Sequence, residues 1–426
     1  MHAPTSLWHA WSLLCLGLML TLPFLAWEKS PPIPSFQAEA IAAALGLLAC
    51  VPLVALASRL ALPRSVLIFP AFAALVVVQM LLGRIAFAQT GLLSLLYLAW
   101  AAALAVLATT LRRELGLERI VSALAWFLVF GSVLNAGIAL AQQLGTHHTF
   151  GRYVLPPSPA ERAWGNLGQP NHLANYLALG IAAAAYLFAA RRMHLLVAAG
   201  IVALCLVVLQ QTGTRAALLY LLAMLAAAGW AAWRAQSGGR RLLAFTAMSL
   251  AAYLLLPAVL RALAPEALEP VGALARWRGD ALAQDLRGRM WSAAWHMFVE
   301  APGLGQGLQM YSHRYFLLNP DLPPAPVRGL LENAHNLPLH VMAEFGLAGL
   351  VVLATAAIAW AAGLRRLPPG PSRWWVLALA AVLGIHSLLE YPLWYTFFLG
   401  PAALVLGLGE GATVEFQHAK APVRRL

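Results

Sequence analysis

LWHAWSLLCLGLMLTLPFLAW, residues 7–27, is an apolar stretch without a single lysine, arginine, aspartate or glutamate. A helix needs about 20 predominantly apolar residues to cross the hydrocarbon core of a bilayer. A cleaved signal peptide would start with a basic segment and carry a shorter apolar core. This stretch has neither property, and it therefore predicts a first membrane-spanning helix.

The rest of the chain repeats this pattern. Of its 426 residues 61% are hydrophobic and 10% charged, whereas soluble domains average roughly 45–50% and about 25%. The composition predicts an all-α, polytopic membrane protein of about twelve transmembrane helices. The expected spans are residues 7–27, 38–58, 65–83, 91–111, 119–143, 173–190, 194–211, 214–233, 241–262, 337–362, 373–390 and 395–410.

The net charge of +12 comes mainly from arginines that stand in short groups between the apolar segments. Cytoplasmic loops of membrane proteins are enriched in arginine and lysine, so these groups predict that both termini lie in the cytoplasm. The basic connections expected there are residues 59–64, 112–119, 191–192, 234–241 and 365–373, followed by the tail with Lys420, Arg424 and Arg425. Nucleic acid is not an expected partner, because the arginines form no continuous basic stripe.

Two long polar segments, residues 145–172 and 263–336, interrupt the pattern on the opposite side. In so apolar a chain these segments are where chemistry in water is expected. The expected organisation is residues 1–262 as helices one to nine, 263–336 as a large outer loop with amphipathic helices, and 337–426 as helices ten to twelve with a cytoplasmic tail.

Arginines also gather in the large loop, where membrane topology does not require them. Arg287, Trp291, Trp295 and Phe298 recur at helical spacing and predict an amphipathic helix at the membrane surface. The neighbouring arginines would either anchor the loop to anionic lipid headgroups or hold a diphosphate, since a guanidinium donates two parallel hydrogen bonds to a phosphate. They are Arg276, Arg278, Arg287 and Arg289.

Arg215 follows Gln210–Thr214 at a very short outer turn and precedes an apolar helix. An arginine at such a boundary can simply extend its side chain towards water. It can also neutralise a departing diphosphate beside the arginines of the large loop. Both interpretations stay open at this point.

His335, within Glu332–Asn336, is the candidate general base, because an imidazole titrates near neutral pH. The alternative is a histidine at the start of a helix. Other polar candidates suit either sugar hydroxyls or helix capping and interfacial anchoring. They are Gln169, Asn171, His172, Asn336 and Tyr391. The remaining histidines show no metal-ligand spacing, so neither a metal nor another cofactor is expected.

Together these motifs resemble the O-antigen ligase superfamily, which comprises O-antigen ligases, O-antigen polymerases and bacterial protein O-oligosaccharyltransferases. The resemblance covers most of the chain from about Phe150 onward. It rests on Thr214-Arg215, Arg287-Gly288-Arg289-Met290-Trp291, Pro302-Gly303-Leu304-Gly305-Gln306-Gly307, and Ala334-His335-Asn336 through Glu344-Phe345-Gly346. The resemblance implies a fold similar to that of GT-C glycosyltransferases in the bacterial inner membrane, with the active site facing the periplasm.

The resemblance also implies a reaction. Such enzymes move glycan from undecaprenyl diphosphate to an acceptor hydroxyl without a metal, and a single displacement would invert the anomeric carbon. Carried over to this sequence, Arg215 and Arg287 would hold the diphosphate, with Arg289 as neighbour or substitute, and His335 would deprotonate the acceptor.

The acceptor stays open at this stage. A compact body of twelve expected helices with one large periplasmic loop is similar to O-antigen ligases that act on lipid A-core, and it favours that acceptor. Residues 165–174 and 390–395 resemble more closely the branch that glycosylates serine or threonine of pilin-like proteins, and a polymerase is the third option. A transporter is the main alternative outside the superfamily. It is disfavoured because the chain shows no internal repeat and its polar residues gather on one face.

Overall fold

The structure is a computed structural model, and it describes residues 6–55, 60–159, 162–263, 281–318, 331–411 and 413–415. Side chains are described in these ranges except at 54–55, 263, 281–285 and 413–415. Arg276 and Arg278, together with Arg59 and the basic groups of the tail, lie outside the described residues.

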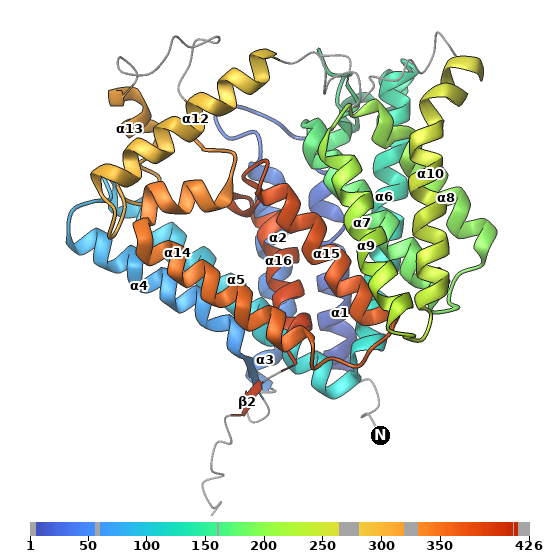
Figure 1. Ribbon diagram of the computed structural model, residues 1–426, viewed down its shortest axis with the longest axis horizontal. Coiled ribbons are helices and arrows are strands. Elements are labelled where there is room, and N and C mark those ends of the chain that lie inside the picture. The colour runs from blue at the N-terminus through green and yellow to red at the C-terminus, as the bar shows by residue number, and fades with distance from the viewer. Residues whose placement is uncertain are drawn as a thin grey trace, which may run out of the picture.

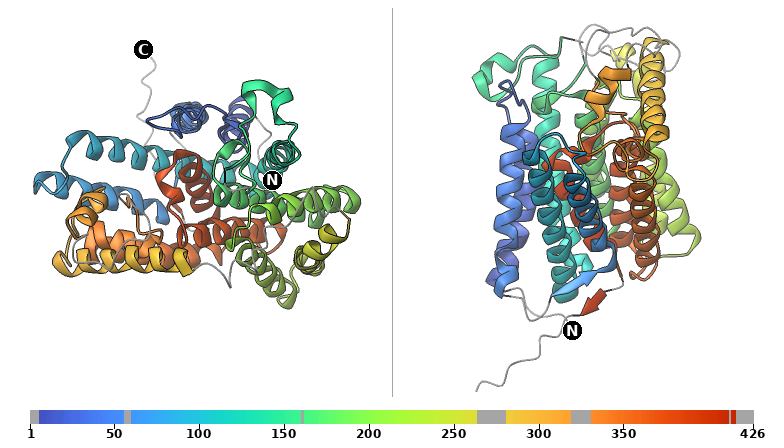
Figure 2. Two further views of the ribbon diagram at one scale, coloured as in Figure 1. Left: turned by 90° about the horizontal axis from the view of Figure 1, so that it is seen from above. Right: turned by 90° about the vertical axis from the view of Figure 1, so that its left-hand side faces the viewer.

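The described chain is almost entirely helical, and its long helices run roughly side by side (Figures 1 and 2). Each predicted span coincides with one of these helices, because charged groups and turns mark the ends of the apolar segments. The helices are α1 (Leu7–Met19), α2 (Phe36–Cys50), α4 (Ile68–Leu81), α5 (Ala88–Leu115), α6 (Leu117–Gln143), α7 (Pro170–Ala189), α8 (Leu195–Gln211), α9 (Ala216–Trp233), α10 (Gly239–Leu263), α14 (Leu337–Leu364), α15 (Pro371–Ser387) and α16 (Thr396–Gly409).

The other described elements join these helices. Five of them are single helical turns: η1 (Leu22–Leu25), α3 (Pro52–Ala55), η3 (Arg64–Leu67), η5 (Gly165–Leu167) and η7 (Pro392–Trp394). The longer ones are η4 (His147–Tyr153), α12 (Ala281–Glu300) and α13 (Tyr311–Leu318). The strands β1 (Ala61–Pro63) and β2 (Thr413–Glu415) pair as an antiparallel ladder in which Leu62 stands opposite Val414, an addition to the expected all-α fold.

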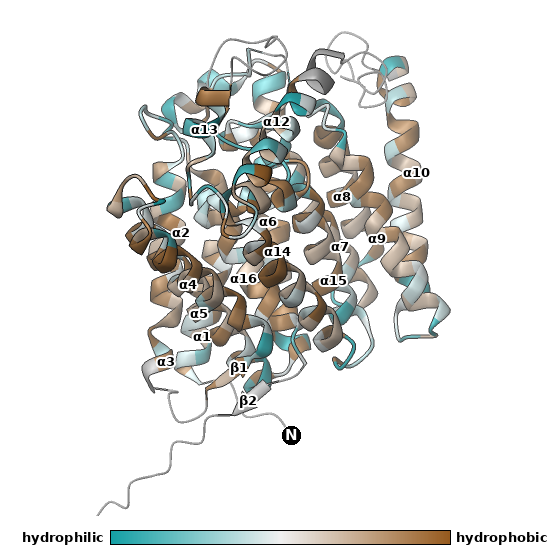
Figure 3. Ribbon diagram, turned by 60° about the vertical axis from the view of Figure 1, so that its left-hand side comes forward, coloured by the Kyte–Doolittle hydropathy of each residue, from teal (hydrophilic) through white to brown (hydrophobic). Residues whose placement is uncertain are grey.

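Within the described residues, eight helical segments are long and apolar enough to cross a membrane. Helices α2, α8 and α16 are apolar but shorter, and α15 has 17 residues. Hydrophobic residues fill the middle of the molecule and hydrophilic ones gather towards its two ends (Figure 3). The chain is thus built as a multi-pass membrane protein, and about twelve crossings remains a prediction.

Helix α7 forms the centre of the largest core. It packs against α6, α8 and α15, and 94% of its most apolar stretch of 18 residues is buried inside the molecule. Small residues such as Ala178 and Ala182 let its neighbours approach closely. A helix buried on all sides is rigid, so the polar residues at its first turn have a fixed position.

Helix α14 is broken at Gly346, whose backbone is left-handed and non-helical with φ 62° and ψ −155°. The backbone groups freed by the break pair with the loop 302–307. The Gln306 and Gly307 amides donate to the carbonyls of Ala343 and Glu344, and the Leu347 amide donates to Pro302. Thus the expected span 337–362 is two helical segments, and the first of them belongs to the outer end of the molecule.

Two side chains from the first half of the chain reinforce this junction. The Gln79 amide donates to the carbonyls of Leu304 and Glu344, each at 2.8 Å, and its oxygen accepts from the Leu308 amide at 3.0 Å. Arg84 donates to the carbonyl of Gly305. The large loop is therefore tied to α4 and to the α4–α5 connection.

Helix α12 is the helix that the spacing of Arg287, Trp291, Trp295 and Phe298 predicted, and small or flexible residues form its packed face. Met290, Ala293, Ala294 and Met297 are buried against α13 and α14. Trp291 and Trp295 are 40% and 55% exposed. The aromatic side chains therefore lie on the outer side of the helix, because the small and flexible residues fit the narrow space beneath it.

Candidate active site

His335 and Glu390 form an ion pair at the end of the helix bundle where α7, α9 and α14 begin. His335 Nδ1 lies 2.9 Å from a carboxylate oxygen of Glu390. The side chain of His335 is 28% exposed and that of Glu390 is 8% exposed. The Tyr391 ring stands edge-on to the imidazole with 5.0 Å between the ring centroids. The pair therefore has one face towards solvent and one towards the protein.

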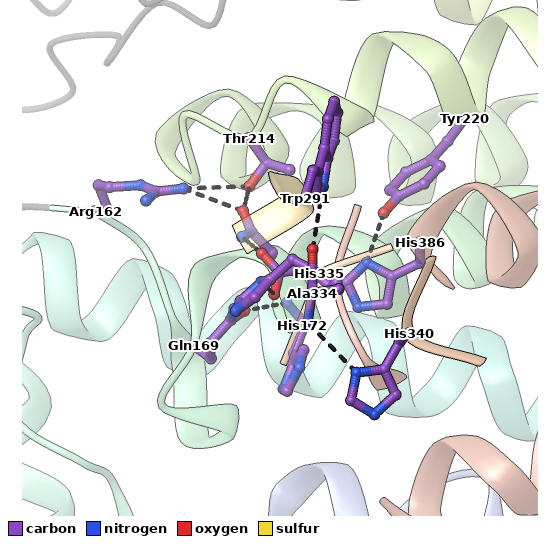
Figure 4. Close-up of polar contacts among 12 residues, drawn as sticks. Arg162, Gln169, His172, Thr214, Tyr220, Trp291, Ala334, His335, His340 and His386 are labelled. Carbon is purple, nitrogen blue, oxygen red and sulfur yellow. Dashed lines mark hydrogen bonds and ion pairs between the residues drawn. The ribbon is translucent and has the colours of Figure 1, made fainter. Parts of the chain in front are cut away.

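The backbone around His335 is held from two sides (Figure 4). The Trp291 indole donates to the carbonyl of Ala334 at 3.1 Å, and the Ala334 amide donates to Nδ1 of His340 at 3.4 Å. His335 itself has φ 49°, a left-handed conformation that histidine, asparagine and aspartate adopt more readily than most residues. These contacts fix the direction in which the imidazole projects.

A chain of hydrogen bonds leads from Glu390 to the turn before α9. The Asn171 amide donates to Glu390 at 2.5 Å, and the Thr214 hydroxyl donates to the Asn171 oxygen at 3.0 Å. Arg162 closes the chain by donating to the Thr212 carbonyl at 2.7 Å and to Thr214 Oγ1 at 3.4 Å. Residues from four separate parts of the sequence thus form one connected network.

The network keeps Glu390 ionised. Burial of the carboxyl raises its pKa, but the hydrogen bond and charge of His335 outweigh burial, with smaller contributions from His386 and His172. The pKa of Glu390 therefore lies below its ordinary value. A carboxylate can only accept hydrogen bonds, so the proton of a neutral His335 resides on Nδ1 and Nε2 can accept a proton.

The predicted arginines belong to two different elements. Arg215 is half-buried at the start of α9 and directly follows Thr214, a member of the network that ends at Glu390. Arg287 is half-buried on α12, one helical turn before Trp291, so the two side chains share a face of the helix. Trp291 in turn donates to the carbonyl of Ala334, the residue before His335.

Arg289 has a different environment. It is 5% exposed, and its Nε donates to the Tyr315 hydroxyl at 2.7 Å. Its guanidinium lies 5.6 Å from the centre of the Tyr315 ring. Arg289 therefore attaches α12 to α13, which is a structural role.

The other predicted polar residues divide into two groups. Gln169 and Asn336 cap helices: their side-chain oxygens accept from the amides of His172 at 2.6 Å and Leu339 at 3.2 Å. Asn171 and Tyr391 contact the His335–Glu390 pair. For Gln169 and Asn336 the capping interpretation therefore describes the structure, while Asn171 and Tyr391 belong to the site.

His172 lies below the pair, among aromatic side chains. Its ring packs edge-on to Tyr395, Phe398 and His386 at centroid distances of 5.3, 5.1 and 5.6 Å. His386 is fully buried and its Nδ1 lies 3.0 Å from the Tyr220 hydroxyl. Both histidines are buried, so they pack beneath the His335–Glu390 pair and are not exposed to solvent.

Sequence reasoning missed three charged residues here. Glu390 stands in the aromatic segment 390–395, which suggested an interfacial anchor and a resemblance to the protein-glycosylating branch, and Arg162 precedes the glycine-rich segment 165–174. Lys29 lies in the connection between η1 and α2, where a Cβ added at Gly168 would be 3.8 Å from its Cε. Burial lowers the pKa of the Lys29 amine to about 8. In the sequence, Glu390 is a single ionisable group inside an aromatic turn, whereas Lys29 and Arg162 each directly follow a glutamate.

Three segments of the chain match protein-family models. Residues 199–354 match the family model described as O-antigen ligase. Residues 163–188 match a protein glycosylation ligase, and residues 374–425 match the C-terminal part of a virulence factor membrane-bound polymerase. A search among curated proteins finds no match. The O-antigen ligase segment contains Arg215, Arg287 and His335. The protein glycosylation ligase segment contains Asn171, and the polymerase segment contains Glu390.

Proposed function

Because the chain belongs to the O-antigen ligase superfamily, we propose that it transfers a glycan from a membrane-bound polyprenyl diphosphate, undecaprenyl diphosphate in bacteria, to an acceptor hydroxyl. The family matches imply a glycan-transferring enzyme. The observation that carries the proposal is the His335–Glu390 pair. Arg215 on α9 and Arg287 on α12 support it, because each lies within one helical turn of a residue that contacts the surroundings of this pair.

In this mechanism His335 is the general base. The Nδ1–H group of neutral His335 donates a hydrogen bond to the carboxylate of Glu390. Nε2 therefore carries the lone pair that takes the proton of the acceptor hydroxyl. The hydroxyl oxygen forms a bond to the anomeric carbon while the bond between that carbon and the phosphate oxygen breaks. The electron pair of the broken bond leaves with the diphosphate. Attack from the side opposite the leaving group inverts the anomeric carbon.

Arg215 and Arg287 stabilise the departing diphosphate. A planar guanidinium donates two parallel hydrogen bonds to a phosphate, and it keeps its positive charge at every physiological pH. Arg289 is already engaged with Tyr315 inside the loop, so Arg287 is the better candidate of the two. No metal is required in this scheme, because two arginines supply the positive charge that a cation would supply.

A protein hydroxyl is the acceptor that we propose first. The segment that matches a protein glycosylation ligase, residues 163–188, contains Asn171. Asn171 stands at the centre of the network that joins Thr214 to Glu390. This branch-specific match therefore coincides with the site itself.

Lipid A-core, which the compact body of the chain favours, is the second candidate. The O-antigen ligase match covers residues 199–354 and includes Arg215, Arg287 and His335. This match contains the transfer chemistry that both branches share. It therefore supports the reaction more strongly than it supports one acceptor.

Reconstitution decides between the two acceptors. The purified protein in liposomes receives undecaprenyl-diphosphate-linked glycan with a radiolabel, together with lipid A-core and a pilin-like protein in the same vessel. Label on the pilin-like protein supports the first proposal, and label on lipid A-core supports the second. Label on neither, with an active related ligase as positive control, contradicts glycan transfer to both.

The arginines have their own test. Arg287→Ala and Arg215→Ala should abolish transfer while the protein still inserts in the membrane. Arg287→Lys should also be poorly active, because an ammonium group cannot reproduce the two-pronged contact. Arg261→Ala near the end of α10 is the control, because the guanidinium of Arg261 is exposed and donates to the carbonyl of Pro257 one turn earlier in its own helix. Full activity of both alanine variants would refute the diphosphate contact.

A further inference from the structure

We propose that the end of the bundle opposite His335 holds a second anion site, an arginine-lined cavity that binds a phosphate group. This inference is independent of the proposed transfer reaction. Helices α6, α10 and α15 begin at that end and α5, α7 and α9 end there, whereas α7 and α9 begin beside His335 and Asn171. The cavity therefore lies a full helix length from the candidate active site.

The cavity has a volume of about 1100 Å³ and lies among four helix connections. These are the connections between α5 and α6, between α7 and α8, between α9 and α10, and between α14 and α15. A volume of this size is at the upper end of the range of small-molecule sites, and it admits a headgroup or a phosphorylated metabolite.

The charged lining is strongly unbalanced. Five arginines and one glutamate contribute to it: Arg119, Arg191, Arg192, Arg240, Arg241 and Glu118. Glu118 is already paired, since its carboxylate lies 2.9 Å from Arg192. Within the described part of the chain, no carboxylate pairs with Arg191, Arg240 or Arg241. The bias of basic residues towards one side of a membrane explains arginines at this end, but it does not explain why they surround one cavity.

Arg191, one of the arginines that line the cavity, has an unfavourable backbone conformation. Its φ is 59°, and helix α7 ends with a Schellman-type pattern in which the Arg191 amide donates to Phe188 and the Arg192 amide donates to Leu187. Glycine is the residue that this position favours, since a Cβ disfavours the left-handed backbone conformation. The arginine at this position therefore supports a binding role for its guanidinium group in the cavity.

Two sources can supply the phosphate. Leu196 at the start of α8 and Trp233 at the end of α9 are 74% and 77% exposed and are close in sequence to the lining segments. Apolar side chains beside a basic cavity suit an anionic phospholipid, whose acyl chains would cover them while its headgroup enters the cavity. A soluble phosphate ester offers the same oxygens without the acyl chains.

The test measures binding to the intact protein in neutral detergent. Native mass spectrometry compares retention of phosphatidylglycerol with retention of phosphatidylcholine, and thermal unfolding follows titration with inorganic phosphate at constant ionic strength. We expect preferential retention of phosphatidylglycerol if a lipid is the source. A rise in Tm with phosphate, without lipid preference, identifies the soluble source.

Two variants remove the site without removing the fold. Arg191→Gly suits the left-handed backbone, so its Tm without ligand should equal or exceed that of the wild type. Its affinity for the retained anion should fall by about tenfold, and the pair Arg240→Gln with Arg241→Gln should have a larger effect. Arg365→Gln is the control, because Arg365 is exposed at the same end but does not line the cavity.

The proposal fails if the wild type shows neither lipid preference nor a response to phosphate. It also fails if both cavity variants bind the anion as well as Arg365→Gln does.

Discussion

His335 Nδ1 lies 2.9 Å from the carboxylate of Glu390, although one residue precedes α14 and the other follows α15. The pairing brings the end of the large loop to the last outer turn of the bundle. A buried carboxylate that orients an imidazole is a recurrent way to prepare a general base, because it fixes both the ring and its tautomer. The mechanism proposed here depends on that orientation.

Glu390→Gln should slow glycan transfer. The amide retains the size of the side chain but removes the charge that favours the protonated imidazole. We expect a loss of at least about tenfold in kcat, with KM for the donor nearly unchanged. Steady-state transfer assays measure both quantities. Glu332→Gln is the matched control, because Glu332 is exposed and close to His335 in sequence; equal activities of the two variants would exclude the role assigned to Glu390.

The same carboxylate makes stability depend on pH. The pKa of Glu390 is below its ordinary value of 4.5 in the folded protein, so its contribution to stability is present above about pH 4.5 and is lost as the pH falls through the folded pKa. The difference in Tm between wild type and Glu390→Gln should therefore be largest at neutral pH and shrink below pH 4.5. A difference that stays constant from pH 7 to pH 3.5 would show that the charge does not matter.

The broken helix gives a prediction about stability. A Cβ at Gly346 would lie 2.7 Å from backbone atoms of Gly303 and Gly305, and the left-handed φ alone costs about 1–3 kcal/mol for other residues. Gly346→Ala should thus lower the Tm clearly. Gly303→Ala is the control in the same junction, since a Cβ there meets no atom within 4 Å. Equal Tm values for the two variants would mean that the junction is not as tight as described.

Lys29 should react unusually at mildly alkaline pH. Burial lowers the pKa of its amine to about 8, whereas an ordinary lysine titrates near 10.4. Acylation by an N-hydroxysuccinimide ester requires the neutral amine, so labelling of Lys29 should level off above pH 8. Lys420, the other lysine in the sequence, is the reference, and peptide mass spectrometry reports both. Parallel increases of both labelling rates up to pH 10 would contradict the lowered pKa.

Hydrophobicity predicted the helices well, because in a chain of this composition charges and turns occur mainly where apolar segments end. The segment 373–390, for example, overlaps helix Pro371–Ser387 in all but the first two residues of the helix. The break at Gly346 could not be predicted from the apolar pattern, because it is stabilised by residues 302–307 and by Gln79, which are distant in the sequence.

The candidate site was predicted only in part. His335 and the arginines are ionisable groups in outer segments, and that alone made them candidates. The network through Arg162, Asn171 and Glu390 is a property of folding, since Glu390 is 219 residues from Asn171 in the sequence. In the sequence, Glu390 stands beside four aromatic or proline residues, a pattern that is typical of an interfacial anchor.

His335→Asn provides the most direct test of the account. Asparagine tolerates the left-handed backbone at this position but cannot act as a base at neutral pH. With donor and acceptor saturating, the account predicts a single-turnover rate of glycan transfer reduced by about 10²–10⁴-fold, with donor binding retained. A rate within tenfold of the wild type would contradict the central claim that His335 takes the proton from the acceptor.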